Sequence, residues 1–155
     1  MNELNHVAFI MDGNGRWGKK NGQGRNFGHF KGVETVKKIV NGSIKSKIKI
    51  VSFYVFSSEN WKRPKAEINF LFKLITNYFA KEIESIIKQG IKINILGEVD
   101  KLSSNVKSIL KKTILLTKKN EKIIVNLAIN YGSKNEILNA VKKNKKKINI
   151  KNFEK

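Results

Sequence analysis

The sequence predicts an α/β fold, built on a mostly parallel sheet with helices on both faces. Short apolar runs alternate with longer segments of helical periodicity, which is typical of β-α-β units. The chain has 155 residues, 40% of them hydrophobic, so it suits one domain with a modest core. It has no cysteine, which excludes disulfides and thiolate metal sites.

Four short segments are predicted to be strands. The first, residues 6–11 (HVAFIM), is an apolar run that stops at an Asp-Gly pair. The second, residues 48–56 (IKIVSFYVF), is rich in β-branched and aromatic residues. Residues 91–96 and 123–129 have the same character. Loops at 12–29, which is rich in glycine, and at 57–64 follow the first two strands.

Four segments between or after these strands are predicted to be helical. Residues 30–44 carry apolar side chains at helical spacing, and residues 65–89 do so over a longer stretch that Gly90 ends. Residues 99–119 and 134–147 complete the set, and the remaining tail is too short to classify. No internal repeat and no linker interrupts the pattern, so we expect a single domain.

The net charge of +20 comes from 32 Lys and Arg against 12 Asp and Glu. Such an excess favours anionic partners, whether nucleic acid, lipid headgroups or phosphorylated substrates. Lysines spread along every segment are also typical of solvated faces. No apolar run has transmembrane length, and the N-terminus lacks a signal-peptide layout. We therefore expect a cytoplasmic protein that is peripheral to the membrane through its charge.

The rare residues gather in the two loops. Arginine occurs only at Arg16, Arg25 and Arg63, and the two tryptophans, Trp17 and Trp61, lie in the same stretches. Arginine grips phosphate with a planar, bidentate fork that lysine lacks. Because ligands bind at the carboxyl ends of parallel strands, the two loops should meet at one rim of the sheet. The sequence therefore predicts one diphosphate site.

The glycine-rich loop also matches two nucleotide motifs. Gly13 to Gly18 fits G-x-G-x-x-G, but no acidic residue ends the second strand and Trp17 crowds the turn. A P-loop would need a hydroxyl where Lys20 stands. What both motifs share is small residues that let backbone N–H groups approach an anion. Asp12 could join a diphosphate through Mg²⁺, although Asp12-Gly13 taken alone is an ordinary turn.

Four stretches, residues 6–17, 25–29, 56–64 and 126–132, resemble the cis-prenyltransferases, in particular the bacterial undecaprenyl diphosphate synthases or isoprenyl transferases. The resemblance implies that isopentenyl diphosphate is condensed with cis geometry onto an allylic diphosphate such as farnesyl diphosphate. The product would be a polyprenyl diphosphate, the precursor of a lipid carrier for cell-wall synthesis. It also implies a homodimer and an apolar product tunnel. The helix from Lys65 could form one wall of that tunnel, although core packing explains its apolar residues equally well.

The resemblance also implies roles for individual residues. Asp12 would hold Mg²⁺ and be the central catalytic residue, and Asn60 stands at the family's proton-acceptor position. Because an amide is a poor general base, we interpret Asn60 as orienting water or substrate. The substrate-binding residues would be Gly13, Asn14, Gly15, Arg16, Trp17, Arg25, His29, Ser57, Ser58, Glu59, Trp61 and Arg63.

Family members continue well beyond the length of this chain. The additional part carries a late motif of Arg, Gly, Glu, Arg and Ser that grips isopentenyl diphosphate, and a later Glu that helps to hold Mg²⁺. No arginine follows Gly132 here. We therefore expect residues 1–155 to form one incomplete domain without the last strands of the family fold. The chain could be a fragment or remnant of a full enzyme, an inactive binding domain, or a subunit whose partner supplies the rest.

A nucleic-acid-binding protein is the alternative from a different class. Its aromatic residues would be expected on a basic platform where bases can stack. Here they lie in apolar stripes and in the two loops. We therefore expect no nucleic-acid partner.

Overall fold

The structure, a computed structural model, describes residues 4–143. Its sheet has four parallel strands in the order β1-β2-β4-β3. The strands are β1 (His6–Ile10), β2 (Ile50–Ser57), β3 (Ile91–Leu96) and β4 (Ile123–Tyr131). The predicted α/β class, the parallel sheet and the four strand positions are confirmed, with boundaries shifted by at most two residues.

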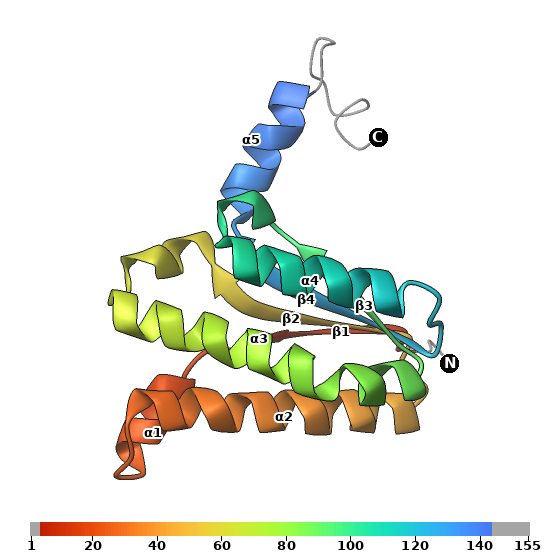
Figure 1. The fold of residues 1–155 in the computed structure, drawn as a ribbon, viewed down its shortest axis with the longest axis horizontal. Coiled ribbons are helices and arrows are strands. Elements are labelled where there is room, and N and C mark those ends of the chain that lie inside the picture. The colour runs from red at the N-terminus through yellow and green to blue at the C-terminus, as the bar shows by residue number, and fades with distance from the viewer. Residues whose placement is uncertain (1–3, 144–155) are drawn as a thin grey trace.

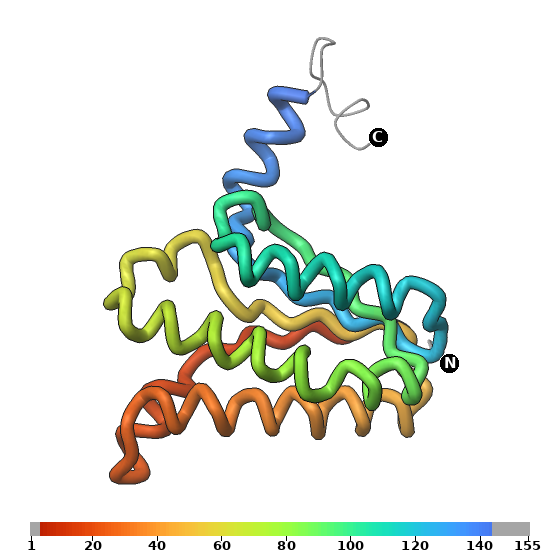
Figure 2. The backbone as a smooth tube through the Cα atoms, viewed as in Figure 1, coloured from red at the N-terminus to blue at the C-terminus, as the bar shows by residue number. Residues whose placement is uncertain are grey.

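Five α-helices and two 3-10 turns connect or follow the strands in the described part of the chain. The helices are α1 (Asn14–Lys20), α2 (Arg25–Lys45), α3 (Lys65–Lys88), α4 (Ser104–Thr117) and α5 (Ser133–Lys143). The turns are η1 (Ser58–Lys62) and η2 (Val99–Lys101). Figure 2 shows that the chain leaves β1 and β2 toward the side of the molecule where α1 and η1 lie.

Three predicted elements differ from the structure. The loop predicted at 12–29 contains α1 and the first residues of α2, because packing on α2 holds a helix that has no apolar periodicity of its own. The helix predicted at 99–119 begins only at Ser104, since extended backbone at Leu102 and Ser103 separates it from η2. The predicted helix at 134–147 is seen as α5, and its last four residues lie outside the described range.

The core lies between one face of the sheet and the layer of α2, α3 and α4, which run side by side in Figure 1. Alternate strand residues point into this layer. Val51 and Phe53 of β2 and Ile123 and Ile129 of β4 are fully buried there. Phe79 and Ile86 of α3, Val40 of α2 and Leu110 of α4 close over them.

The other face of the sheet differs from the expectation of helices on both faces. Among residues 4–143 no helix covers it, and its strand residues form a polar row instead. His6 Nε2 lies 2.8 Å from Ser52 Oγ, which also accepts from Asn126 Nδ2 at 3.0 Å, and Asn94 Nδ2 donates to Asn126 Oδ1 at 3.2 Å. These polar groups satisfy one another across all four strands, which allows the face to stay open to water.

The uncovered face becomes apolar at the carboxyl ends of its strands. Ile10 is 80% exposed, Tyr54 44% and Leu96 40%. Tyr131 packs edge-on against Tyr54, with ring centroids 5.6 Å apart. We call Ile10, Tyr54, Leu96 and Tyr131 the open apolar group, and it borders the rim predicted to bind diphosphate.

Glycines let α1 and α2 approach each other at backbone distance. A Cβ on Gly28 would lie 1.8 Å from the carbonyl oxygen of Asn14, and one on Gly18 would lie 2.6 Å from that of Gly24. Gly32 gives room to the Asn14 side chain in the same way, at 2.5 Å. The clustering of glycine in this region is therefore explained by helix contact as well as by any ligand.

We predict that Gly28→Ala lowers the free energy of unfolding by about 2 kcal/mol or more, because the methyl group forces α1 away from α2. Gly42→Ala is the matched control in the same helix, since a Cβ there meets nothing within 4 Å. That control should raise the free energy of unfolding by about 0.5–1 kcal/mol. Urea unfolding of both variants measures the difference, and equal effects would contradict the close approach.

Candidate active site

The two predicted loops meet at the carboxyl ends of β1 and β2. Asp12, Ser57, Asn60 and Arg63 line one pocket of about 280 Å³ there, together with Ile10 and Tyr54 of the open apolar group. One residue from the first loop, Asp12, and three from the second therefore share one concave surface, as the topology of a parallel sheet requires.

Asp12 stands at the mouth of this pocket with its side chain 70% exposed. Gly13 N–H donates to Asp12 Oδ1 at 2.6 Å, and Arg16 Nη2 donates to Oδ2 at 3.0 Å. Gly13 adopts a φ of 86°, a left-handed conformation that favours glycine. The carboxylate is therefore held in one orientation while it stays open to solvent and to a ligand.

A buried carboxylate that we did not foresee organises the cations of the site. Glu67, in the first turn of α3, has a side chain only 8% exposed. Arg25 grips it with Nε and Nη2, both at 2.9 Å. His29 Nε2 lies 3.1 Å and Arg63 Nη1 3.3 Å from Glu67 Oε1. The hydrogen bonds from Arg25, with those from His29, lower the pKa of Glu67 from its ordinary 4.5 to about 2.

His29 is buried beside this carboxylate and lines a narrow apolar cavity of about 70 Å³ with Asn14 and Arg63. Burial lowers the pKa of His29, against the raising effect of Glu67. A neutral imidazole that donates from Nε2 to Glu67 keeps Nδ1 as its acceptor. The ring is thereby fixed in one tautomer at the inner end of the site.

The cluster carries an excess of positive charge. Two guanidinium groups, Arg25 and Arg63, face the single carboxylate of Glu67, and their side chains are 39% and 30% exposed. Each guanidinium has five N–H donors, of which Glu67 uses two from Arg25 and one from Arg63. The remaining donors can bind an anion without breaking the contacts that hold the cluster.

The second loop is closed by its own side chains. Ser57 and Asn60 form a reciprocal capping box at the start of η1, with Ser57 N–H donating to Asn60 Oδ1 at 3.1 Å. Because the acceptor oxygen of Asn60 is engaged, its amide NH₂ is the group that remains for a ligand. This arrangement supports an orienting role for Asn60 over a basic one.

Asn130 joins the ends of three strands and is a second residue that sequence reasoning missed. It is buried, adopts a φ of 51°, accepts from Trp61 Nε1 at 2.7 Å and donates to the Glu98 carbonyl oxygen at 2.8 Å. Trp61 also packs against Phe56 and Phe72, with centroids 5.3 and 5.9 Å away. Trp61 thus supports the loop from behind. Asparagine tolerates a positive φ, but that preference alone does not predict from the sequence that Asn130 connects Trp61 with Glu98.

Not all predicted site residues face this pocket. Trp17 lies on the outer side of α1 and stacks on Phe27. Ser58 and Glu59 line a neighbouring pocket of about 330 Å³ with Tyr131 and Gly132. Gly15 is buried, and a Cβ on it would lie 2.9 Å from the Arg25 guanidinium carbon. Gly15 therefore makes room for Arg25.

Comparison with known proteins shows the family of the chain. Residues 10–155 match the family model described as putative undecaprenyl diphosphate synthase. The chain belongs to this family, the cis-prenyltransferases. It is 43% identical over 137 residues to an isoprenyl transferase of Clostridium tetani, covering 88% of this chain and 54% of that protein. An isoprenyl transferase of Bacillus thuringiensis is 40% identical over 136 residues, covering 88% and 53%.

Two solved structures share the cis-prenyltransferase fold. Lavandulyl diphosphate synthase from Lavandula x intermedia, solved with dimethylallyl diphosphate, has a TM-score of 0.90 at 25% identity, covering 98% of this chain and 70% of that one. A probable undecaprenyl diphosphate synthase from Campylobacter jejuni has a TM-score of 0.79 at 33% identity, covering 99% and 68%. The chain spans about half the length of the curated relatives it matches.

The donor set at the rim suits Mg²⁺ only together with a diphosphate. Among residues 4–143 no three His, Cys, Asp or Glu side chains gather as a metal-binding group. Mg²⁺ is commonly held by one or two carboxylates with substrate phosphates and water as its other ligands. The exposed Asp12 fits that arrangement.

Among residues 4–143, no helix is long and apolar enough to cross a membrane.

We predict that Glu67→Gln lowers the free energy of unfolding at pH 7 by about 2–3 kcal/mol, because the guanidinium groups of Arg25 and Arg63 lose their counter-charge. Since the folded-state pKa of Glu67 is depressed to about 2, its stabilisation is present above pH 4.5 and is lost as the pH falls toward 2. Urea unfolding between pH 3 and pH 7 should show a smaller acid loss for the variant.

Glu34→Gln is the control, since the Glu34 side chain is 44% exposed and pairs only with Lys31 among the described residues. It should change the free energy of unfolding by less than about 0.5 kcal/mol. Equal effects of the two substitutions would show that Glu67 does not hold the cluster.

Proposed function

We propose that this chain binds an allylic diphosphate, farnesyl diphosphate, and that its site condenses isopentenyl diphosphate onto it with cis geometry. The observation that carries the proposal is the shared pocket of Asp12, Asn60 and Arg63, backed by the cation cluster on Glu67. Guanidinium donors, backbone N–H groups and one exposed carboxylate are the groups that a diphosphate with Mg²⁺ requires.

The chemistry would break the allylic C–O bond, form a C–C bond to isopentenyl diphosphate and release one proton. In this scheme Arg25 and Arg63 bind the departing diphosphate, and Glu67 keeps their guanidiniums in place. Asp12 would hold Mg²⁺, which supplies charge neutralisation to the leaving group when bound. Asn60 would orient substrate or water through its NH₂, and Arg16, Gly13 and Ser57 would complete the diphosphate contacts.

The isoprenoid tail would lie between α2, α3 and the covered face of the sheet. Two narrow apolar cavities, of about 70 and 50 Å³, follow each other there and share Val36. The first begins at Met11 and His29, next to the cation cluster, and the second reaches Tyr78 and Ile86. Their small volumes mean that a long chain must move α2 and α3 apart, so α3 serves as core in this structure and would serve as tunnel wall with product bound.

A second candidate function is an incomplete domain that needs further polypeptide for catalysis. The open apolar group borders the pocket of Asp12, and this face of the sheet lacks a cover among residues 4–143. Polypeptide equivalent to the rest of the longer relatives would cover this face and close the site. The same proposal includes a homodimer, a cytoplasmic location with peripheral membrane contact, and a role in making a cell-wall lipid precursor.

We predict that the chain binds farnesyl diphosphate in the presence of Mg²⁺ and that Asp12→Asn weakens this binding at least about tenfold, the cost of one charged metal contact. Without Mg²⁺ the variant should bind at least as well as the original chain. Calorimetry measures the binding in both conditions. Asp100→Asn is the control, because Asp100 is exposed in η2 and lines neither the pocket of Asp12 nor the pocket of Ser58 and Glu59. No heat with either protein would refute the proposal.

We predict that the pure chain incorporates labelled isopentenyl diphosphate at least about a hundredfold more slowly than the same chain mixed with the remaining part of the Clostridium tetani relative. Two missing charge-assisted contacts suffice for that factor. The control mixture contains Arg25→Ala chain, which should stay inactive. Rapid elongation by the pure chain would contradict the second candidate function and leave the first standing.

A further inference from the structure

Three aromatic rings stand exposed together on the outer side of α1 and α2. Trp17 is 47%, Phe27 37% and Phe30 47% exposed. The rings of Trp17 and Phe27 stack with centroids 6.1 Å apart and an angle of 11°. Lys31 Nζ lies 5.7 Å from the centroid of Phe27 and 5.8 Å from that of Phe30. We call Trp17, Phe27, Phe30 and Lys31 the aromatic patch.

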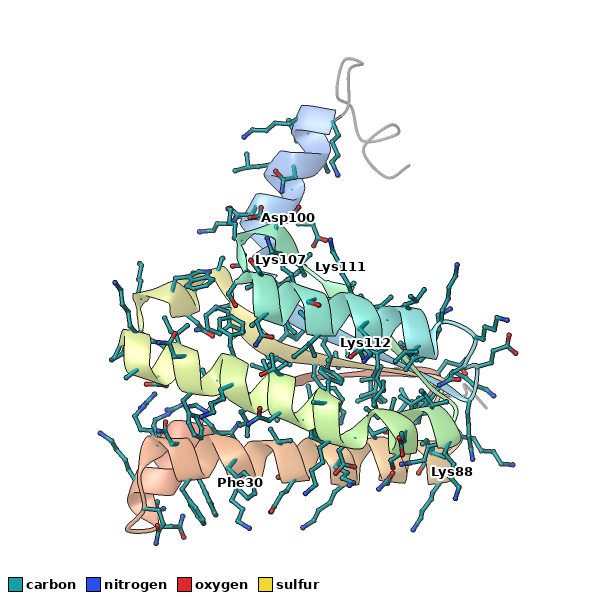
Figure 3. All side chains as sticks on the ribbon, viewed as in Figure 1. Phe30, Lys88, Asp100, Lys107, Lys111 and Lys112 are labelled. Carbon is teal, nitrogen blue, oxygen red and sulfur yellow. The ribbon has the colours of Figure 1, made fainter. Side chains whose placement is uncertain are left out.

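None of the residues of the aromatic patch belongs to the hydrophobic core in the described part of the chain. The inner side of α2 supplies Val40 and His29 to the interior, whereas Phe30 points away from the sheet in Figure 3. Single exposed apolar residues are ordinary, but three adjacent rings from two helices form a contiguous surface. Such a surface is typical of an interaction site.

The surroundings of the patch are basic. Lys19 and Lys20 are exposed in the last turn of α1, beyond Trp17, and Lys31 lies among the rings while it pairs with Glu34 at 2.9 Å. Aromatic rings bordered by lysines are the side chains that favour the boundary between water and lipid. The lysines add attraction to anionic headgroups.

We propose that the aromatic patch docks this protein onto an anionic lipid surface, with the ring edges inserted among the headgroups. Nucleic acid fits less well, because base stacking needs open ring faces. Here Trp17 and Phe27 cover a face of each other, and Lys31 lies over Phe27 and Phe30. The inference rests on the peripheral membrane contact of the proposed function and deepens it, since it names the surface that docks and the charge of the lipid. Lipid docking requires no prenyl transfer, so vesicle binding tests it separately from the enzymatic reaction.

Docking at this patch would place the candidate site close to the bilayer. Phe30 follows His29 directly in α2, so Phe30 and the cation cluster lie on different sides of the same helical turn, about 100° apart around the helix axis. Trp17 and Arg16 are neighbours in α1 in the same way. A lipid product would then be formed within one helix diameter, about 10 Å, of the membrane surface.

The test is sedimentation of the full chain with vesicles of phosphatidylglycerol and phosphatidylcholine, compared with phosphatidylcholine alone. The Phe30→Ser, Lys31→Ser double variant should bind the anionic vesicles roughly tenfold more weakly, from one lost ring and one lost charge. The matched control is Leu115→Ser, Lys112→Ser on α4, where Leu115 is 71% exposed and Lys112 is also exposed. That control should change binding less than about twofold.

Circular dichroism shows whether the double variant is folded. If it is not, a second measurement tests the proposal without changing the patch. Trp61→Phe leaves Trp17 as the only tryptophan, since the chain has two. Its emission should shift to the blue with anionic vesicles and stay unchanged with phosphatidylcholine. Absence of vesicle binding, equal loss in both double variants, or an unshifted Trp17 emission would overturn the proposal. So would binding of single-stranded RNA that depends on the patch while lipid binding does not.

Discussion

The Glu67 carboxylate is the constraint on which the candidate site depends. It lies in the first turn of α3 and binds Arg25 and His29 of α2 as well as Arg63 of the second loop. One buried acid therefore joins two helices and a loop, and it fixes the spacing of the groups proposed to bind diphosphate. A buried carboxylate with several charged donors is costly to leave unpaired, so the cluster forms as a unit or not at all.

A second constraint is the close approach of backbone at the rim. Gly28 and Gly32 bring Asn14 against α2, which sets the course of the chain just after Asp12. On the other side, Asn130 holds Trp61 and the turn after β3. The two devices place the loops after β1 and β2 around one pocket. Its remaining side opens onto the uncovered face of the sheet, where the open apolar group lies.

Sequence patterns predicted the elements whose apolar residues repeat with a clear period. The strands and the long helices α2 and α3 belong to this group, because burial selects apolar side chains at regular spacing. α1 has no such pattern and forms through contact with α2. The polar row of His6, Ser52, Asn94 and Asn126 could have indicated an uncovered face, since alternate polar residues are typical of strands with one open side.

By itself, the sequence determined the family, the parallel α/β class and the two loops that carry arginine and tryptophan. These conclusions follow from local composition, from motif identity and from the rule that parallel strands end at one edge. Only the tertiary structure decided which residues act together. Glu67 is 42 residues from Arg25 and Asn130 is 69 from Trp61 along the chain, and no periodicity records such contacts. The exposure of Trp17, Phe27 and Phe30 as one patch likewise depends on how α1 packs against α2.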